Sequence, residues 1–200
     1  MLSFVFYLWI LLTTIVTTIC TFSLLQPFWI VHPDNTHSFG LHLYCIAMSG
    51  IYPGKHYLKR TCLSYGGNFR LSSIPSGAWQ ASWLLFSFGC LTMVLSIILG
   101  IIGMCIQTTM EKKIERLTTY LQTTAVIVMA SALLVFPLGM DTHFFRYYCG
   151  ESADVYNAAQ CSIGWSYMLA IMGTALSIFC PVLWNFRDVK NENLTLGDHV

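Results

Sequence analysis

The stretch SGAWQASWLLFSFGCLTMVLSIILGIIGMCIQTTM, residues 76–110, contains no Asp, Glu, Lys or Arg. Three further stretches share this property: residues 1–31, 117–140 and 162–186. About 20 apolar residues are enough for a helix to cross the hydrocarbon core of a bilayer. A helix also satisfies its own backbone hydrogen bonds, as lipid requires. The sequence therefore predicts four membrane-spanning helices within one tetraspan domain, residues 1–187.

The positions of these helices also set the bounds of the loops and the tail. We expect helices at about residues 4–25, 78–106, 118–138 and 162–184, outer loops at about 26–77 and 139–161, and a short cytosolic tail at 188–200. Residues 1–20 have the apolar character of a signal peptide but lack a charged beginning, so we expect them to be retained as the first helix.

The composition narrows the class of function. Of the 200 residues, 56% are hydrophobic and 10% are charged, whereas soluble domains carry about 25% charged residues. The formal net charge is +1 and no basic patch is present, so nucleic acid is not an expected partner. The lipid bilayer is the expected environment.

The sequence gives no support for catalysis or transport. No predicted helix carries an ionisable residue in its middle, whereas ion paths and proton relays need such groups. Cys-x-x-Cys, His-Glu-x-x-His and a Gly-rich phosphate loop are all missing from the sequence, and the histidine spacings match no zinc motif. We therefore expect no enzyme activity, no catalytic residue, no cofactor and no metal site.

The first outer loop reads as short β-strands. Phe39, Leu41, Leu43 and Cys45 alternate with other residues, which places them on one face of a strand. Strands of this kind, with turn residues between them, predict a small antiparallel sheet over the outer ends of the helices. Trp29 is expected to be a structural anchor where the first helix enters this sheet, since an indole suits the membrane interface.

Each outer loop contains two cysteines: Cys45 and Cys62 in the first, Cys149 and Cys161 in the second. Cysteines on one side of a membrane fit an oxidising compartment. Four cysteines allow three connectivities, and free thiols are the alternative. Pairing within each loop is the economical choice, and each such bond would contribute about 3 kcal/mol by the chain-entropy estimate.

The cysteines also decide the expected topology. Ten Lys and Arg residues divide equally between the two sides, but those on one side lie closer to the helix ends. Together with the oxidising environment of the loops, this predicts that both termini lie in the cytosol. We also expect the protein to lie in the plasma membrane.

Three features are candidate partner surfaces. Ser162, Ser166, Ala170 and Thr174 form a stripe of small residues along the fourth helix, which is either internal packing or a face for a partner's helix. The competing surface is the sheet around Phe39, Leu41, Leu43 and Tyr44. The tail ends with Asp198 and Val200, which have the spacing of a PDZ-domain ligand.

Six short motifs in this order resemble one known family. They are QPFW (26–29), FGLHLYC (39–45), IPSGAW (74–79), FPLG (136–139), CG (149–150) and CSIGWSY (161–167). On these residues the chain resembles the lipoma HMGIC fusion partner-like (LHFPL) tetraspan family, within the claudin-like superfamily. Phe28 and Met140 stand where the family usually has Tyr and Trp, which makes the chain a divergent member.

The resemblance implies a left-handed four-helix bundle under an extracellular sheet. It also implies a role as auxiliary subunit of another membrane protein, because related members accompany a mechanotransduction channel in hair cells or help to place inhibitory receptors at synapses. A second copy of the chain is a further expected partner. The alternative function is claudin-type adhesion or barrier formation between cells.

Overall fold

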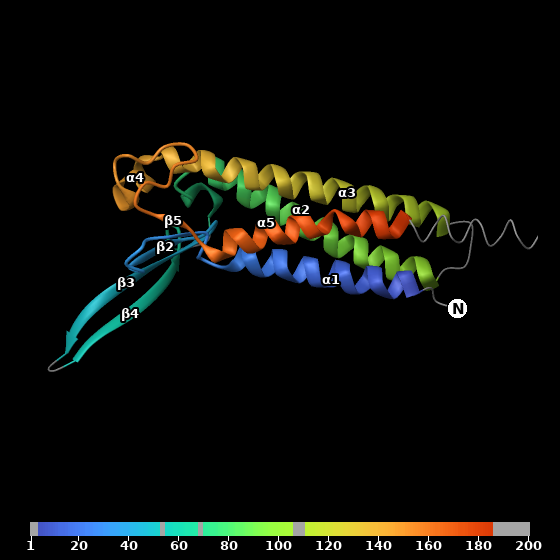
Figure 1. Cartoon of the computed structure of the whole chain (residues 1–200), viewed down its shortest axis with the longest axis horizontal. Coiled ribbons are helices and arrows are strands. Elements are labelled where there is room, and N and C mark those ends of the chain that lie inside the picture. Colours follow the sequence, from blue (N-terminus) through green and yellow to red (C-terminus); the bar gives the residue numbers. More distant parts are fainter. Residues whose placement is uncertain (1–3, 53–54, 68–69, 106–110, 186–200) are drawn as a thin grey trace, which may run out of the picture.

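A computed structural model describes residues 4–52, 55–67, 70–105 and 111–185. Asn193, Asp198 and Val200 of the tail lie outside the described residues. Long helices run side by side, and a small sheet lies at one end of the bundle (Figure 1). We call this the sheet end. The first and last described residues, Phe4 and Asn185, both lie at the opposite end (Figure 1).

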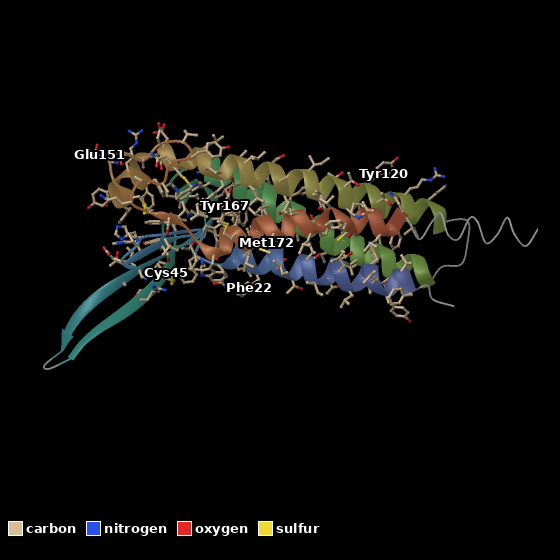
Figure 2. The ribbon with its side chains drawn as sticks, viewed as in Figure 1. Phe22, Cys45, Tyr120, Glu151, Tyr167 and Met172 are labelled. Carbon is tan, nitrogen blue, oxygen red and sulfur yellow. A yellow bond between two sulfur atoms is a disulfide. The ribbon has the colours of Figure 1, made fainter. Side chains whose placement is uncertain are left out.

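Four helices are long and apolar enough to cross a membrane, as the charge-free stretches predicted. The long helices are α1 (Phe4–Leu25), α2 (Gly77–Cys105), α3 (Glu111–Val135) and α5 (Trp165–Ser177), and helical structure resumes after Ile178 as far as residue 185. Helix α1 packs against α2 and α5, and α3 packs against the same two helices. Apolar side chains, including Phe22 and Met172, lie on the outside of the bundle, where lipid would surround them (Figure 2).

Three helix starts differ from the prediction. Helix α3 begins at Glu111, so Lys112, Lys113 and Arg116 lie in its first turns rather than in a connecting loop. Helix α2 begins with a cap from Ser76, whose Oγ accepts from the Ala78 N–H at 3.2 Å. Helix α5 begins at Trp165, and the preceding Ser162 belongs to a strand. For α2 and α5, charge-free sequence continues through the boundary, whereas α3 begins in the charged segment before its charge-free stretch, so these stretches do not mark the helix starts.

The sheet joins both outer loops. Its strands are β1 (Ile30–Val31), β2 (His37–Phe39), β3 (Leu43–Tyr52), β4 (Lys55–Ser64) and β5 (Ser162–Ile163), in the order β4-β3-β2-β1-β5. The neighbouring strands are antiparallel, and β1 and β5 pair Ile30 with Ile163. Because β5 directly precedes α5, the sheet is attached to the bundle at both α1 and α5.

Strands β3 and β4 form a hairpin that extends well past the rest of the sheet (Figure 1). Their pairing runs from Leu43–Ser64 to Tyr52–Lys55. Strand β2 pairs with β3 only at Tyr44, Cys45 and Ile46. We call this hairpin, β3 with β4, the arm.

The end of the bundle away from the sheet has its own core of aromatic and polar side chains. The rings of Trp9 and Trp184 are fully buried, with centroids 4.3 Å apart. The Trp9 Nε1–H donates to Oε1 of Gln122 at 3.4 Å, and the Gln122 amide contacts Ser96 Oγ at 3.4 Å. Gly100 leaves room for the Trp9 ring, since a Cβ there would lie 2.5 Å from it. Hydrogen bonds between helices α1, α2 and α3 therefore satisfy the polar atoms of this core.

Helix α3 ends at a proline within its membrane-spanning segment. Pro137 lies in the 3₁₀ segment η2 (Phe136–Asp141) and has no backbone N–H. In an α-helix that N–H would bond the carbonyl of Leu133, and in a 3₁₀ helix that of Leu134. Pro137 therefore cannot supply a backbone donor to either carbonyl, at a depth where lipid offers none.

Side chains from other segments bond the carbonyls at this end of α3. The Tyr167 hydroxyl donates to the Leu133 carbonyl, and the Tyr156 hydroxyl donates to the Leu134 carbonyl, both at 2.9 Å. The Trp79 indole N–H donates to the Phe136 carbonyl at 3.2 Å. Figure 2 shows Tyr167 inside the bundle near the sheet end. The outer end of α3 is therefore held by α2, α5 and the second loop together.

We expect Tyr167→Phe to destabilise the protein by about 1–2 kcal/mol, because the Leu133 carbonyl would remain buried without its donor. Thermal unfolding of the purified protein in detergent measures this loss. Tyr147→Phe is the matched control, since Tyr147 is 77% exposed. Equal unfolding temperatures for both variants would show that the Tyr167 bond has no role in stability.

Candidate interaction surface at the sheet end

Trp29 connects the sheet to the bundle. Its side chain is 1% exposed and contacts the rings of Phe86, Phe136 and Tyr167. Its indole N–H donates to the Ser23 carbonyl near the end of α1 at 2.8 Å. The residue four positions after Ser23 is Pro27, which has no N–H to offer that carbonyl. The Gln26 N–H also donates to this carbonyl, at 3.3 Å, so the Trp29 side chain supplies a second and shorter hydrogen bond at the point where Pro27 ends the helical pattern.

Two glycines allow the chain to pass close to the segment that follows α1. A Cβ on Gly40 would lie 2.6 Å from the Gln26 carbonyl oxygen, and a Cβ on Gly164 would overlap the Phe28 carbonyl. The Gly164 N–H donates to the Trp29 carbonyl at 2.8 Å. Any side chain at either glycine would push the sheet away from α1.

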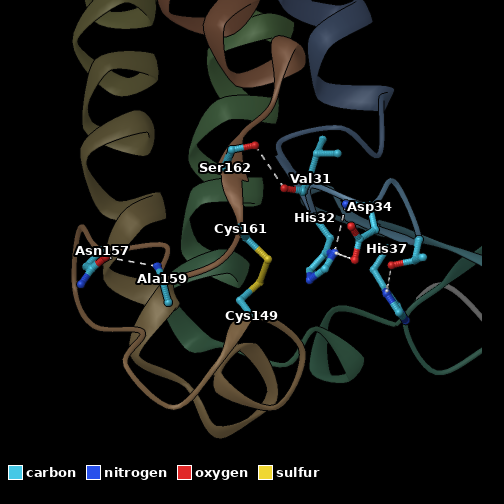
Figure 3. The surroundings of a disulfide bond; sticks show 10 residues. Val31, His32, Asp34, His37, Cys149, Asn157, Ala159, Cys161 and Ser162 are labelled. Atoms are coloured by element: carbon cyan, nitrogen blue, oxygen red, sulfur yellow. Dashed lines mark hydrogen bonds and ion pairs between the residues drawn. A yellow bond between two sulfur atoms is a disulfide. The ribbon is translucent and has the colours of Figure 1, made fainter.

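Both outer loops are closed by the expected disulfides. Cys45 and Cys62 are directly opposite each other in β3 and β4, with Cα atoms 4.0 Å apart, and they lock the base of the arm. Cys149, at the end of α4 (His143–Cys149), is joined to Cys161, which directly precedes β5 (Figure 3). The second disulfide closes a loop that we call the lobe, residues 150–160.

The first predicted partner surface is buried rather than exposed. Phe39 and Leu41 are almost completely buried. The prediction that they share one strand face with Cys45 is wrong, because the chain turns between β2 and β3: Phe39 pairs with Tyr44, and Cys45 pairs with Ser38 on the opposite face. Leu43 and Tyr44 are only partly exposed. This correction arises because the alternation of residues 39–45 continues through a turn between two strands, and because alternation does not show which face is covered. Here the apolar face of the sheet covers the bundle end.

The small-residue stripe of α5 is also buried within the chain. Ser166 and Ala170 are 0% exposed and Thr174 is 5% exposed. The Ser23 hydroxyl donates to the Ser166 carbonyl at 2.7 Å, and a Cβ on the neighbouring Gly173 would lie 2.7 Å from the Cys20 sulfur. The stripe lets α5 approach α1 closely. It is internal packing, and a partner helix cannot reach it.

The lobe is an exposed surface that the sequence did not predict. Glu151, Asp154, Val155 and Tyr156 are exposed. Internal bonds fix the loop: Asp154 and Asn157 exchange backbone hydrogen bonds, and the Asn157 side chain accepts from the Ala159 N–H at 3.1 Å (Figure 3). Tyr156 and Ala159 have positive φ angles, 61° and 51°, which only a well-fixed loop maintains in such residues. Neither periodicity nor a motif marks this loop in the sequence.

The histidines of the first loop fix a turn. His32 lies 3.6 Å from the Asp34 carboxylate, and the Thr36 hydroxyl lies 2.8 Å from Nδ1 of His37 (Figure 3). Burial lowers the pKa of His37, and the nearby His32 lowers it further. Burial also lowers the pKa of His42. Within the described residues, no group of three or more His, Cys, Asp and Glu side chains could hold a metal ion.

The structure has four spanning helices, a small sheet and one disulfide in each outer loop. We compared the sequence with known protein families, and one family matches most of it. The family model described as lipoma HMGIC fusion partner-like protein matches residues 5–186. The chain belongs to this family. The LHFPL motifs quoted above lie at the contacts just described: Trp29, Trp79 and Tyr167 donate to carbonyls at helix ends, Gly40 permits a close approach of the sheet, and Pro137 lies where α3 ends.

Individual members of the LHFPL family match most of the chain. The LHFPL tetraspan subfamily member 7 protein of Xenopus tropicalis is 34% identical over 196 residues, which cover 94% of each chain. The member 3 protein of Danio rerio is 30% identical over 200 residues, covering 96% of this chain and 87% of its own. The member 4 protein of Bos taurus is 30% identical over 201 residues, covering 94% and 75%.

We expect Trp29→Ala to lower stability by about 3–5 kcal/mol, because a fully buried ring and a carbonyl donor are lost together. Trp165→Ala is the matched control, since Trp165 is 45% exposed, and a much smaller loss is expected there. Thermal unfolding in detergent and the level at the cell surface measure both effects. Normal folding of Trp29→Ala with a selective loss of partner binding would instead make Trp29 a binding residue.

Proposed function

We propose that this LHFPL-family protein is a non-enzymatic accessory subunit of another integral membrane protein in the plasma membrane, such as a channel or a receptor. Family membership supports this function, because the resemblance implies an auxiliary role. The observation that supports this accessory function is that the polar groups inside the bundle bond to the chain itself. Buried hydroxyls there donate to carbonyls of the same chain, as Thr13, Ser82 and Ser96 do. This interior serves packing, and recognition is left to the outer surfaces.

The sheet end is the surface best suited to recognition. It has fixed geometry, because two disulfides and the β1–β5 pairing hold it to the bundle. It also exposes chemically varied groups, including Tyr147, Glu151 and Tyr156. The helices offer mostly apolar side chains that lipid or a partner's helix can contact. A partner is then bound laterally, through its own membrane helices and its outer domain.

Affinity capture from a native membrane, followed by mass spectrometry, tests this function. We expect one integral membrane protein to be enriched over a tetraspan of unrelated sequence expressed at the same level. Deletion of residues 191–200 should leave this capture intact, because the lateral contacts are elsewhere. Loss of capture on tail deletion, with a normal surface level, would favour a PDZ-type role for Asp198 and Val200.

The alternative function is claudin-type adhesion, and the projecting arm favours it. An arm that extends away from the bundle is able to meet a facing cell. Mixing two labelled cell populations that express the protein separates the two functions. Aggregation of expressing cells, with no membrane protein captured, would support adhesion and contradict the accessory function.

We further propose that both termini are cytosolic. The basic residues Lys113 and Arg116 lie at the end of the bundle away from the sheet, and the two disulfides lie at the sheet end. The chain's Asn-x-Thr sequon, at Asn193, lies in the tail. We expect it to remain unglycosylated, because glycans are added on the opposite side of the membrane. A glycosidase-sensitive shift that Asn193→Gln removes would invert the topology.

A further inference from the structure

A row of ring contacts connects α1, the segment after it, strand β4 and helix α5. The Phe22 ring on α1 lies 6.0 Å from the Trp165 ring on α5, and Trp165 stacks on Phe28 with ring centroids 5.6 Å apart. The Arg60 guanidinium carbon lies 5.4 Å from the centre of the Phe28 ring. We call these four residues the aromatic ladder. It lies on the surface of the protein, because Phe22 and Trp165 are 49% and 45% exposed.

The aromatic ladder crosses the end of the membrane-spanning segments. Phe22 lies within the span of α1, which ends at Leu25, and Trp165 is the first residue of the last span. Phe28 and Arg60 lie beyond these ends, in the segment after α1 and in strand β4. The ladder therefore runs from the hydrocarbon region to the depth of lipid headgroups, where aromatic rings commonly gather. Arg60 is its member at headgroup depth.

The Arg60 side chain is fixed in position, and its charge is accessible. One guanidinium nitrogen donates to the Asn35 carbonyl at 3.1 Å, and the Phe28 ring adds a cation–π contact. The rest of the side chain is exposed. The acidic residue of the first loop, Asp34, lies 3.6 Å from His32, and among the carboxylates that the structure describes none forms an ion pair with Arg60. A guanidinium has five N–H donors, so others remain for an anion.

Apolar surface continues from the aromatic ladder toward the middle of the membrane. On α1, Ile15 lies two turns before Phe22 and is exposed. On α5, Met168 and Met172 lie one and two turns after Trp165, and both are exposed. Helices α1 and α5 pack against each other, and Figure 2 shows Phe22 and Met172 on the outside of the bundle. An acyl chain can lie on this surface while a headgroup reaches the guanidinium.

We propose that the aromatic ladder binds one phospholipid of the leaflet on the sheet side of the membrane. The Arg60 guanidinium contacts the headgroup phosphate, because its planar N–H donors match phosphate oxygens. Phe22 and Trp165 contact an acyl chain of the same lipid. A phospholipid carries an anion and apolar chains at the two depths where the ladder offers a cation and apolar rings. This complementarity favours a phospholipid over the apolar helix of a partner protein.

Lipid-dependent stabilisation of the purified protein tests this site. Thermal unfolding in a mild detergent is followed while dioleoylphosphatidylcholine or dioleoylglycerol is added. We expect the phospholipid to raise the unfolding temperature at a roughly tenfold lower concentration, because dioleoylglycerol has the same acyl chains but no phosphate. Phosphocholine and inorganic phosphate have no acyl chains and should have little effect at the same concentrations. Equal stabilisation by the two lipids, or by free phosphate, overturns the proposal.

Variants assign the effect to the aromatic ladder. R60Q should raise the phosphatidylcholine concentration required by roughly tenfold and leave the response to dioleoylglycerol unchanged. R70Q is the matched control, since Arg70 is an exposed arginine of the same loop, and it should behave as the wild type. W165A should weaken the response to both lipids. F88A removes an exposed ring from α2 instead, and it should not.

Three outcomes with these variants overturn the proposal. One is a phosphatidylcholine response of R60Q equal to that of R70Q. Another is a lower stability of R60Q without lipid together with an unchanged lipid response, which would limit Arg60 to supporting the base of the arm. The third is lower capture of another membrane protein by W165A with an unchanged lipid response, which would make a partner's helix the occupant. If R60Q does not fold, native mass spectrometry replaces it: the wild type should retain bound phosphatidylcholine that W165A has lost, and equal retention overturns the proposal.

Discussion

Two prolines near helix ends determine how this protein is assembled. Pro27 and Pro137 each remove a backbone donor from a helix within or next to the membrane, where water cannot replace it. Aromatic side chains donate to carbonyls at these ends: Trp29 to Ser23 of α1, beside the Gln26 N–H, and Tyr156 and Tyr167 to Leu134 and Leu133 of α3. Each of these hydrogen bonds fixes the position of the side chain that donates it. The aromatic rings attached to those donors then form the core between the helices and the sheet.

This arrangement explains why the sheet end is rigid. Trp29 contacts rings from α2, η2 and α5, so the segment after α1 is tied to three other elements at the bundle's outer end. The β1–β5 pairing adds a backbone connection between the first and second loops. Gly40 and Gly164 permit these close approaches because neither has a side chain. The base of the arm and the lobe are therefore supported by buried contacts.

Much of this fold could be predicted from the sequence, because lipid imposes simple rules. Long stretches without charge predicted the four spanning helices, and two cysteines in each loop predicted the two disulfides. Strand β5 was not predicted, because two residues beside a helix give no periodic signal. Phe39 and Leu41 were expected on an exposed face, since alternation does not identify what covers it. The lobe was missed because its order depends on hydrogen bonds within the loop and on the bond from Tyr156 to Leu134, none of which leaves a periodic pattern in the sequence.

The distances along the chain between each carbonyl and its donor set an order for biosynthesis. Ser23 and Trp29 are 6 residues apart, so α1 is completed as soon as the next few residues have been made. Leu133 and Tyr167 are 34 residues apart, and Leu134 and Tyr156 are 22 apart. Helix α3 is thus synthesised before its donors exist and stays incomplete until α5 arrives. A chain that stops within the second loop would retain unbonded carbonyls in the membrane, a defect that cellular quality control can recognise.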